Sequence, residues 1–251
     1  MSPLSRRTLL AAGLVAAGTS VVAAAATLGR SLGLVPPDAG GIYGPGETLT
    51  YAAHRLVGRH AMAREFSPEM ISAKPFANSV RRPDEAFLRH QDAAFATWRL
   101  AVDGLIAHPL SLSLAELRAM GVGRQVTEIS CEEGWSYIAE WIGTPLGSVL
   151  DMAAVKPGAR YVVYQSHDVN AWDSIDLDEA RHPQTLLAWG MNGGELPVPF
   201  GGPLRMRVPR QLGYKSTKYV VRLVVTDSLA GFGTGKGSAD ADGGYSWYAG
   251  I

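Results

Sequence analysis

The chain has 251 residues, 47% of them hydrophobic, and its 23 Lys and Arg residues balance its 23 Asp and Glu residues. That balance gives no electrostatic basis for binding nucleic acid or an anionic membrane surface. The single cysteine excludes an internal disulfide framework, a four-cysteine zinc site and a haem attached through a pair of cysteines.

The first 26 residues have the pattern of an export signal. Arg6 and Arg7 precede an apolar, alanine-rich run over residues 11–28 that contains no charge. Adjacent arginines before such a run predict twin-arginine export, and the alanines at 24–26 offer a cleavage site. Because this route carries folded proteins, we expect a cofactor-bearing periplasmic protein. The run is also about long enough to span a bilayer, so an uncleaved membrane anchor is an alternative.

The rest of the chain is predicted to form a linker over residues 27–46, rich in Gly and Pro, and one domain over residues 47–251. Ser113 and Glu116 form a capping-box pattern that opens a helix through Met120. Hydrophobic periodicity predicts strands at 98–104, 125–130, 160–165, 185–191, 204–208 and 219–226, a helix from Pro145 and a helical turn at 176–180. Short helices among many strands, without regular βαβ alternation, predict an α+β fold with a strand-rich C-terminal half.

Cys131 is the first candidate functional residue. It follows the predicted strand at 125–130, and residues 127–136 read Thr-Glu-Ile-Ser-Cys-Glu-Glu-Gly-Trp-Ser. A lone thiol in an exported protein indicates a reactive or metal-binding role, and thiolate is a soft ligand suited to a redox metal. The alternative is a buried cysteine that packs as a small apolar side chain.

A second candidate site is a cluster of basic residues near the C-terminus. Arg205 and Arg207 alternate in a predicted strand and so point to one face. Lys215, Ser216, Thr217 and Lys218 follow and can supply charge, hydroxyl groups and backbone N–H groups. Such a set suits the phosphate of a cofactor, because the Arg guanidinium group can donate two parallel hydrogen bonds to phosphate oxygens and the Lys ammonium group adds a compact positive charge. A solvated pair of basic strands is the alternative.

Several separate motifs together resemble the molybdopterin domain of the sulfite oxidase superfamily. They are the Cys131 motif and the runs at 141–146 (Trp-Ile-Gly-Thr-Pro-Leu), 191–193 (Met-Asn-Gly), 202–205 (Gly-Pro-Leu-Arg) and 216–218 (Ser-Thr-Lys). Within that superfamily they look most like the periplasmic methionine sulfoxide reductase catalytic subunit. The resemblance covers about residues 70–251 and implies a mixed α+β fold around one molybdenum-molybdopterin. It also implies that Cys131 is the protein's ligand to molybdenum.

Carried onto this chain, the resemblance assigns further residues to the cofactor. Arg205 would bind the pterin phosphate, with Ser216, Thr217 and Lys218 completing that pocket. Ser166 falls near a hydroxyl contact of the family. Asn78 matches a cofactor-contacting asparagine, and Phe200 replaces the polar residue that the family usually places before its Gly-x-Pro-x-Arg run.

Two departures from the sulfite oxidases bear on the substrate. Trp172 stands about where those enzymes place an active-site Tyr, and Glu132 and Glu133 follow the cysteine where eukaryotic-type enzymes carry Arg. Two carboxylates beside the metal would repel sulfite, whereas a neutral S-oxide or N-oxide suffers no such repulsion. The sequence therefore favours oxygen-atom removal from a neutral oxide, with Cys131 and Trp172 as its catalytic residues.

The electron source is expected to be a separate protein. The sequence has no haem motif, and in the system that it resembles the partner is a membrane haem protein. Two alternatives stay open at this point. One is a sulfite-oxidising enzyme of the same family, and the other is a non-catalytic periplasmic binding or assembly protein on the same fold.

Overall fold

The computed structural model describes residues 27–78, 84–168 and 170–251, and the chain divides into two units, Met1–Gly58 and Arg59–Ile251. In the first unit, residues 27–31 are helical and α2 spans Gly44–Leu56. Part of the segment predicted as a linker is therefore helical. The predicted export segment, residues 1–26, lies outside the described residues. Nowhere in the described parts is a helix both long and apolar enough to cross a membrane.

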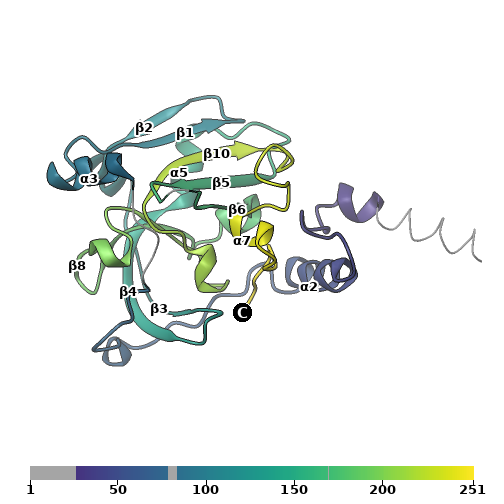
Figure 1. Cartoon of the computed structure of the whole chain (residues 1–251), viewed down its shortest axis with the longest axis horizontal. Coiled ribbons are helices and arrows are strands. Elements are labelled where there is room, and N and C mark those ends of the chain that lie inside the picture. Colours follow the sequence, from purple (N-terminus) through teal and green to yellow (C-terminus); the bar gives the residue numbers. More distant parts are fainter. Residues whose placement is uncertain (1–26, 79–83, 169) are drawn as a thin grey trace, which may run out of the picture. The chain divides into compact units, whose positions relative to one another are not determined.

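The second unit contains two β-sheets (Figure 1). The first has the strand order β2-β1-β10-β5-β6, in which β1 and β10 are parallel and the other neighbours antiparallel. Its strands are β1 (Leu100–Gly104), β2 (Leu110–Leu112), β5 (Tyr161–Ser166), β6 (Trp172–Asp176) and β10 (Val220–Thr226).

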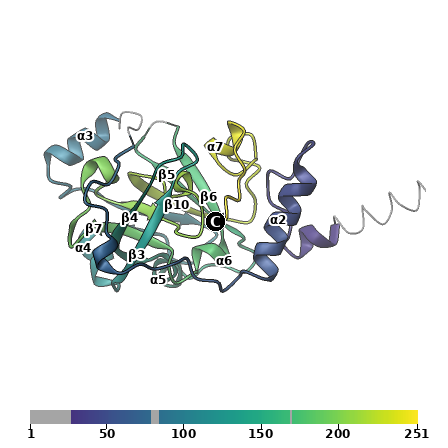
Figure 2. The same ribbon diagram turned by 90° about the horizontal axis from the view of Figure 1, so that it is seen from below.

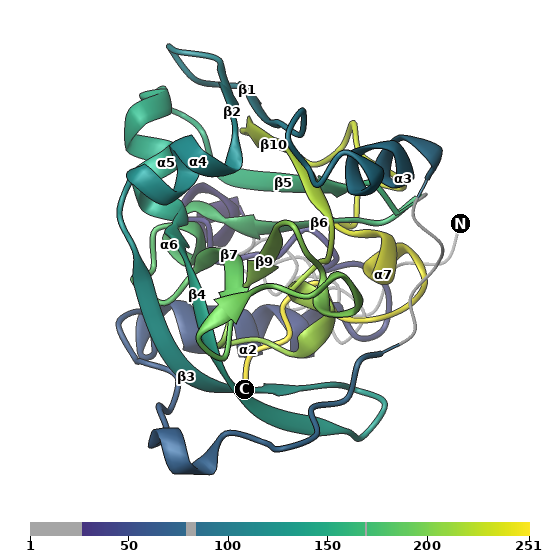
Figure 3. The ribbon, with the colours of Figure 1, turned by 90° about the vertical axis from the view of Figure 1, so that its left-hand side faces the viewer.

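The second sheet has the order β3-β4-β7-β8, and β9 also pairs with β7. Its strands are β3 (Gly123–Ser130), β4 (Ser136–Pro145), β7 (Leu186–Met191), β8 (Gly194–Glu195) and β9 (Arg205–Arg207). Figure 3 shows β3 and β4 as a long, curved hairpin. The sheets therefore present one hairpin turn and several strand ends from which a site can be assembled.

Short helices connect the strands. They are α3 (Glu85–Asp92), α4 (Leu114–Ala119), α5 (Leu146–Ala153), α6 (Leu177–Ala180) and α7 (Ala239–Asp242), with 3-10 helices at Pro68–Met70, Val198–Phe200 and Gly213–Lys215. In Figure 2, α3 and α7 lie towards the top of the view and α4, α5 and α6 towards the bottom. This is the α+β architecture that the sequence predicts.

The main hydrophobic core lies between the first sheet and α5. The helix predicted from Pro145 is α5, and its apolar face is fully buried. This face packs with Leu100 and Val102 of β1 and with Val162 of β5. Burying one such aliphatic side chain contributes about 1.5–3 kcal/mol. A second, smaller cluster under the β3–β4 hairpin contains Tyr137 and Trp141. This smaller cluster packs the hairpin against Ala188 and Met191 of β7.

The predicted strands at 98–104, 125–130, 160–165, 185–191, 204–208 and 219–226 are confirmed within a few residues, as is the capping box of α4. Four strands were not predicted, namely the short β2 and β8 and the longer β4 and β6. In β4, burial alternates up to Trp141 and then becomes continuous through Thr144, because that half pairs with β7 inside the protein. A strand covered on both faces loses the alternation by which strands are recognised.

Residues 59–78 run along the β3–β4 hairpin. Glu65 forms a β-bridge with Thr127, and the Phe66 N–H donates to the Val126 carbonyl at 2.9 Å. Further on, the Ser72 N–H donates to the Ile138 carbonyl of β4, also at 2.9 Å. The segment thus contacts both strands of the hairpin and leads to Asn78.

Candidate molybdopterin site

Cys131 occupies the turn of the β3–β4 hairpin. Its N–H donates to the Trp135 carbonyl at 2.9 Å, and its carbonyl accepts from the Gly134 N–H at 3.0 Å. Gly134 has φ 90°, a conformation that a residue with a Cβ rarely adopts. In β3, Gln125, Thr127 and Ile129 are buried, and the same alternation continues to Cys131. The turn thus places the thiol on the protein side of the hairpin.

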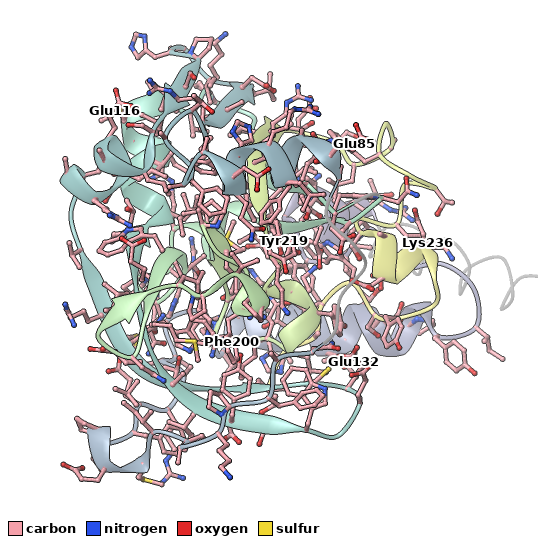
Figure 4. The ribbon with its side chains drawn as sticks, turned by 60° about the vertical axis from the view of Figure 1, so that its left-hand side comes forward. Glu85, Glu116, Glu132, Phe200, Tyr219 and Lys236 are labelled. Carbon is pink, nitrogen blue, oxygen red and sulfur yellow. The ribbon has the colours of Figure 1, made fainter. Side chains whose placement is uncertain are left out.

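Two carboxylates lie beside the Cys131 thiol. The Sγ atom donates to Oε2 of Glu132 at 3.1 Å and lies 3.9 Å from Oε2 of Glu133. Glu133 also accepts a hydrogen bond from the Trp135 indole N–H at 2.8 Å. Burial, reinforced by these two acids, raises the pKa of the Cys131 thiol to about 12. Figure 4 shows Glu132 at the turn of the hairpin.

Arg205 is fixed by the loop that follows β9. Its Nε donates to the Ser216 carbonyl at 2.8 Å and its Nη1 to the Phe200 carbonyl at 3.0 Å. The Ser216 hydroxyl accepts from the Val208 N–H at 3.1 Å, which closes the loop onto the strand. A Cβ at Gly213 would stand 3.2 Å from the Ser130 carbonyl, so the loop passes close to the end of β3. The basic loop and Cys131 therefore belong to one site.

Lys218 lies at the other end of this loop. Its ammonium group donates to the carbonyls of Asn78 at 2.9 Å and Pro199 at 2.6 Å, and its own carbonyl accepts from the Ser166 hydroxyl at 2.8 Å. Burial, and after it the charge of Arg205, lowers the pKa of Lys218 to about 7. These contacts connect three segments that are far apart in the sequence.

Three buried or half-buried cations gather here. Arg205 and Arg207 both lie over the Trp141 ring, 5.4 and 5.3 Å from its centre, on the face that their alternation predicts. Burial, and then the charge of Arg205, lowers the pKa of Arg207 to about 9. Within the described residues, none of Arg205, Arg207 and Lys218 forms an ion pair with a carboxylate. The charge of Arg205 thus disfavours the charged forms of Arg207 and Lys218, and a bound anion would offset that repulsion. Arg205 and Lys218 line the pocket described below, whereas Arg207 does not.

The eight residues that the sequence assigns to the cofactor or to catalysis line one open pocket of about 210 Å³. They are Asn78, Cys131, Ser166, Trp172, Arg205, Ser216, Thr217 and Lys218. The pocket therefore combines a thiol, a group of cations and an aromatic wall. Among the described residues, no three His, Cys, Asp or Glu side chains are grouped as metal ligands. A metal at Cys131 would thus take its other ligands from a cofactor or from solvent.

Lys215 does not join the phosphate-binding set that its position in the sequence indicates. Its side chain is fully buried, and it pairs with Asp173 on β6 and donates to the Ser174 carbonyl at 2.8 Å. The Lys215 ammonium also lies 5.3 Å from the centre of the Trp247 ring. Because Ser216 follows Lys215 and Trp172 precedes Asp173, this ion pair ties together two walls of the pocket.

Several residues that line the pocket were not predicted from the sequence to have a role there. Trp135 and Tyr137 are stacked with their rings 5.9 Å apart, and Phe76 packs against Trp135 at 5.1 Å. The alternation of Trp135, Tyr137 and Ala139 at the start of β4 could have indicated Tyr137. Asp240, in α7, also lines the pocket but is brought there only by the tertiary fold.

A model of the oxidoreductase molybdopterin-binding domain family matches residues 88–230. The chain belongs to this family. The resemblance to the sulfite oxidase superfamily is thereby confirmed, and with it the expectation of an oxidoreductase fold. The family match includes Cys131, Arg205 and Lys218, which the structure brings to one pocket.

Family members with assigned names include sulfoxide reductases. A protein of Azospira oryzae, named as the methionine-sulfoxide reductase subunit YedZ1, is 37% identical over 73% of this chain and 66% of its own length. The protein-methionine-sulfoxide reductase catalytic subunit MsrP of Xanthomonas campestris is 37% identical over 53% of this chain and 46% of its own. The MsrP of Ralstonia nicotianae is 32% identical over 67% of this chain and 62% of its own length. The chain thus spans about half to two thirds of the length of these relatives.

Among solved structures, the sulfane dehydrogenase SoxCD of Paracoccus pantotrophus shares the fold. The TM-score is 0.51 at 21% sequence identity, over 68% of this chain and 46% of that chain. At this identity the likeness concerns the fold of the molybdopterin-binding family and not its substrate.

Proposed function

We propose that this protein binds molybdenum-molybdopterin and reduces a neutral S-oxide, with methionine sulfoxide as the favoured substrate. The observation that carries the proposal is a single pocket that holds the Cys131 thiol together with Arg205 and Lys218. These cations have no carboxylate partners among the described residues, which fits a ligand that carries a phosphate. Coordination to a metal ion would stabilise the thiolate form of Cys131, which would offset the high pKa of its free thiol.

Each side chain of the pocket has a role in this proposal. Cys131 is the protein's ligand to the metal. Arg205 and Lys218 hold the pterin phosphate, with Ser216 and Thr217 as hydrogen-bond partners. Ser166, at the end of β5, and Asn78, at the end of the segment 59–78, also bind the cofactor. When bound, the cofactor supplies two-electron oxygen-atom transfer.

The acids beside Cys131 favour a neutral substrate. The carboxylates of Glu132 and Glu133 lie 3.1 and 3.9 Å from the Cys131 sulfur, so an incoming sulfite anion meets negative charge. Trp172 offers an apolar wall and an indole N–H, which suits a thioether group that carries a polar S=O. In the net reaction the S=O bond breaks, and two electrons and two protons yield a thioether and water. The names of the similar MsrP proteins agree with this substrate.

We further propose that the protein works in the periplasm and receives its electrons from a separate subunit, a membrane haem protein. The adjacent Arg6 and Arg7 before an apolar run support twin-arginine export. The name "catalytic subunit" of the similar MsrP proteins supports a second subunit. If the apolar run is not cleaved, it would anchor the protein to the membrane.

The test uses the holoenzyme purified from a periplasmic fraction. Elemental analysis should find molybdenum near one atom per chain. With reduced viologen as electron donor, methionine sulfoxide should be turned over, whereas sulfite at the same concentration should not reduce the oxidised enzyme. If sulfite rapidly reduces the enzyme and no S-oxide or N-oxide is turned over, the protein oxidises sulfite and the proposed direction is wrong. A folded protein that binds a phosphate ligand but carries no molybdenum would instead be a binding module.

A further inference from the structure

A second cavity, of about 410 Å³, adjoins the molybdopterin site. The two cavities share Ser166, Ala171 and Trp172, so Trp172 stands on the boundary between them. The walls of the second cavity come mainly from the first sheet, whose strands β1, β10, β5 and β6 lie side by side in Figure 1. We refer to it as the sheet groove.

The floor of the sheet groove is one row of residues across the strands. Ala101 of β1 is in register with Arg222 of β10, Arg222 with Gln165 of β5, and Gln165 with Trp172 of β6. Their neighbours Leu100 and Val102 are buried in the core, so Ala101 and the rest of the row face outward. At about 4.8 Å between strands, the row is about 14 Å long, which equals about four extended residues.

The groove is polar but its charges are already paired. Arg222 donates to both carboxylate oxygens of Asp103, at 2.7 and 3.0 Å, and Arg99 donates to Glu116 at 2.8 Å. A second phosphate group would require unpaired cations, as in the neighbouring pocket. The sheet groove therefore selects for a ligand without strong charge.

Amide groups supply the remaining hydrogen-bonding capacity. Gln165 accepts from Arg222 at 3.3 Å through its oxygen, and within the described residues its amide nitrogen has no protein partner. Asn170 adds a second side-chain amide at the groove wall. Side-chain amides both donate and accept, which matches the N–H and C=O groups of a peptide backbone. Ala101 and Ala171 also line the groove, and their small side chains leave room beside these amides.

We infer that the sheet groove binds the polypeptide segment that flanks a methionine sulfoxide, while the sulfoxide side chain enters the pocket past Trp172. The inference rests on the proposed function and extends it, because it assigns the groove to the main chain of a protein substrate. Free methionine sulfoxide would use the pocket alone. The groove would thus determine preference for polypeptides without taking part in oxygen transfer.

The test compares two substrates on the holoenzyme, free methionine sulfoxide and a blocked peptide with methionine sulfoxide between glycines. Ala101→Trp fills the groove from an outward strand position, where an aromatic residue is well tolerated. It should lower kcat/KM for the peptide by about tenfold or more, as expected when main-chain contacts are lost, and leave free methionine sulfoxide within about twofold. Val224→Trp, at another outward position of the same sheet but outside the groove, is the matched control and should change neither value.

A second variant provides an independent test in case Ala101→Trp does not fold. Gln165→Leu keeps the size of the side chain but removes its amide, and it should raise KM for the peptide alone. Equal peptide kinetics in Ala101→Trp and wild type would overturn the inference, as would an equal loss on both substrates. If wild type reduces free methionine sulfoxide but not the peptide, the proposed function stands and the groove assignment fails. If wild type reduces neither, both fail.

Discussion

The buried pair between Lys215 and Asp173 leads to a quantitative prediction. Both side chains are at most 1% exposed, and Lys215 also donates to the Ser174 carbonyl at 2.8 Å. The Lys215→Met variant keeps most of the side-chain volume but leaves the carboxylate buried without its cation. Breaking a buried pair in this way costs about 3–5 kcal/mol. A loss of this size is a large share of the roughly 5–15 kcal/mol by which domains are stable.

The pH dependence of this cost follows from Asp173. Burial raises the pKa of Asp173 to about 7, so the folded protein favours the protonated carboxyl more than the unfolded chain does. The group's contribution to stability is therefore complete at acid pH and is lost as the pH rises through 7. In Lys215→Met the pKa of Asp173 should rise further. The difference between variant and wild type should accordingly be larger at pH 8.5 than at pH 6.

The assay is urea unfolding of wild type and variants, followed by tryptophan fluorescence. Arg181→Met breaks an exposed pair with Asp151 and serves as control, with an expected cost of about 0–1 kcal/mol. The double variant Lys215→Met with Asp173→Leu should recover most of the loss, because no lone charge stays buried. The reasoning is refuted if Lys215→Met costs no more than Arg181→Met at pH 8.5, above the pKa of Asp173.

Three further predictions concern the pocket. Cys131→Ser should fold and retain pterin but lose viologen-linked turnover, and wild-type turnover in that variant would exclude Cys131 as the metal ligand. Arg205→Ala removes a charge-assisted contact worth about 1.5–3 kcal/mol and should purify with depleted molybdopterin. Full occupancy with a raised KM would instead place Arg205 in the substrate pocket. Because the pKa of Lys218 is lowered to about 7, protein prepared without cofactor should bind sulfate more weakly as pH rises from 6 to 8. Calorimetry would measure this, with Lys218→Met as a control that loses most of the pH dependence.

The sequence allowed much of the site to be predicted, because its residues sit in short motifs at strand ends. The alternation of residues 125–130 placed Cys131 at the end of β3, and the alternation of Arg205 and Arg207 placed both on one face. Such patterns are local, and the structure preserves them. The assignment of roles within the pocket is still a prediction for the experiments above.

Other parts of the site depend on contacts between distant segments. Nothing around Lys215 indicates that its partner is Asp173, 42 positions earlier in the chain, because β6 was not recognised as a strand. The sheet groove also cannot be predicted from the sequence, because its floor depends on the strand register across β1, β10, β5 and β6. Register is fixed by packing of the whole sheet and not by the residues of one strand.

The cations of the pocket are fixed largely by main-chain oxygen atoms. Arg205 donates to the carbonyls of Ser216 and Phe200, and Lys218 donates to those of Asn78 and Pro199. Every residue type has a carbonyl, so these supports can survive substitution of the side chains that surround them. In evolution the neighbours of the basic residues can therefore drift while the phosphate-binding geometry stays intact. Phe200 is an example, because it supports Arg205 through its carbonyl and not through its aromatic side chain.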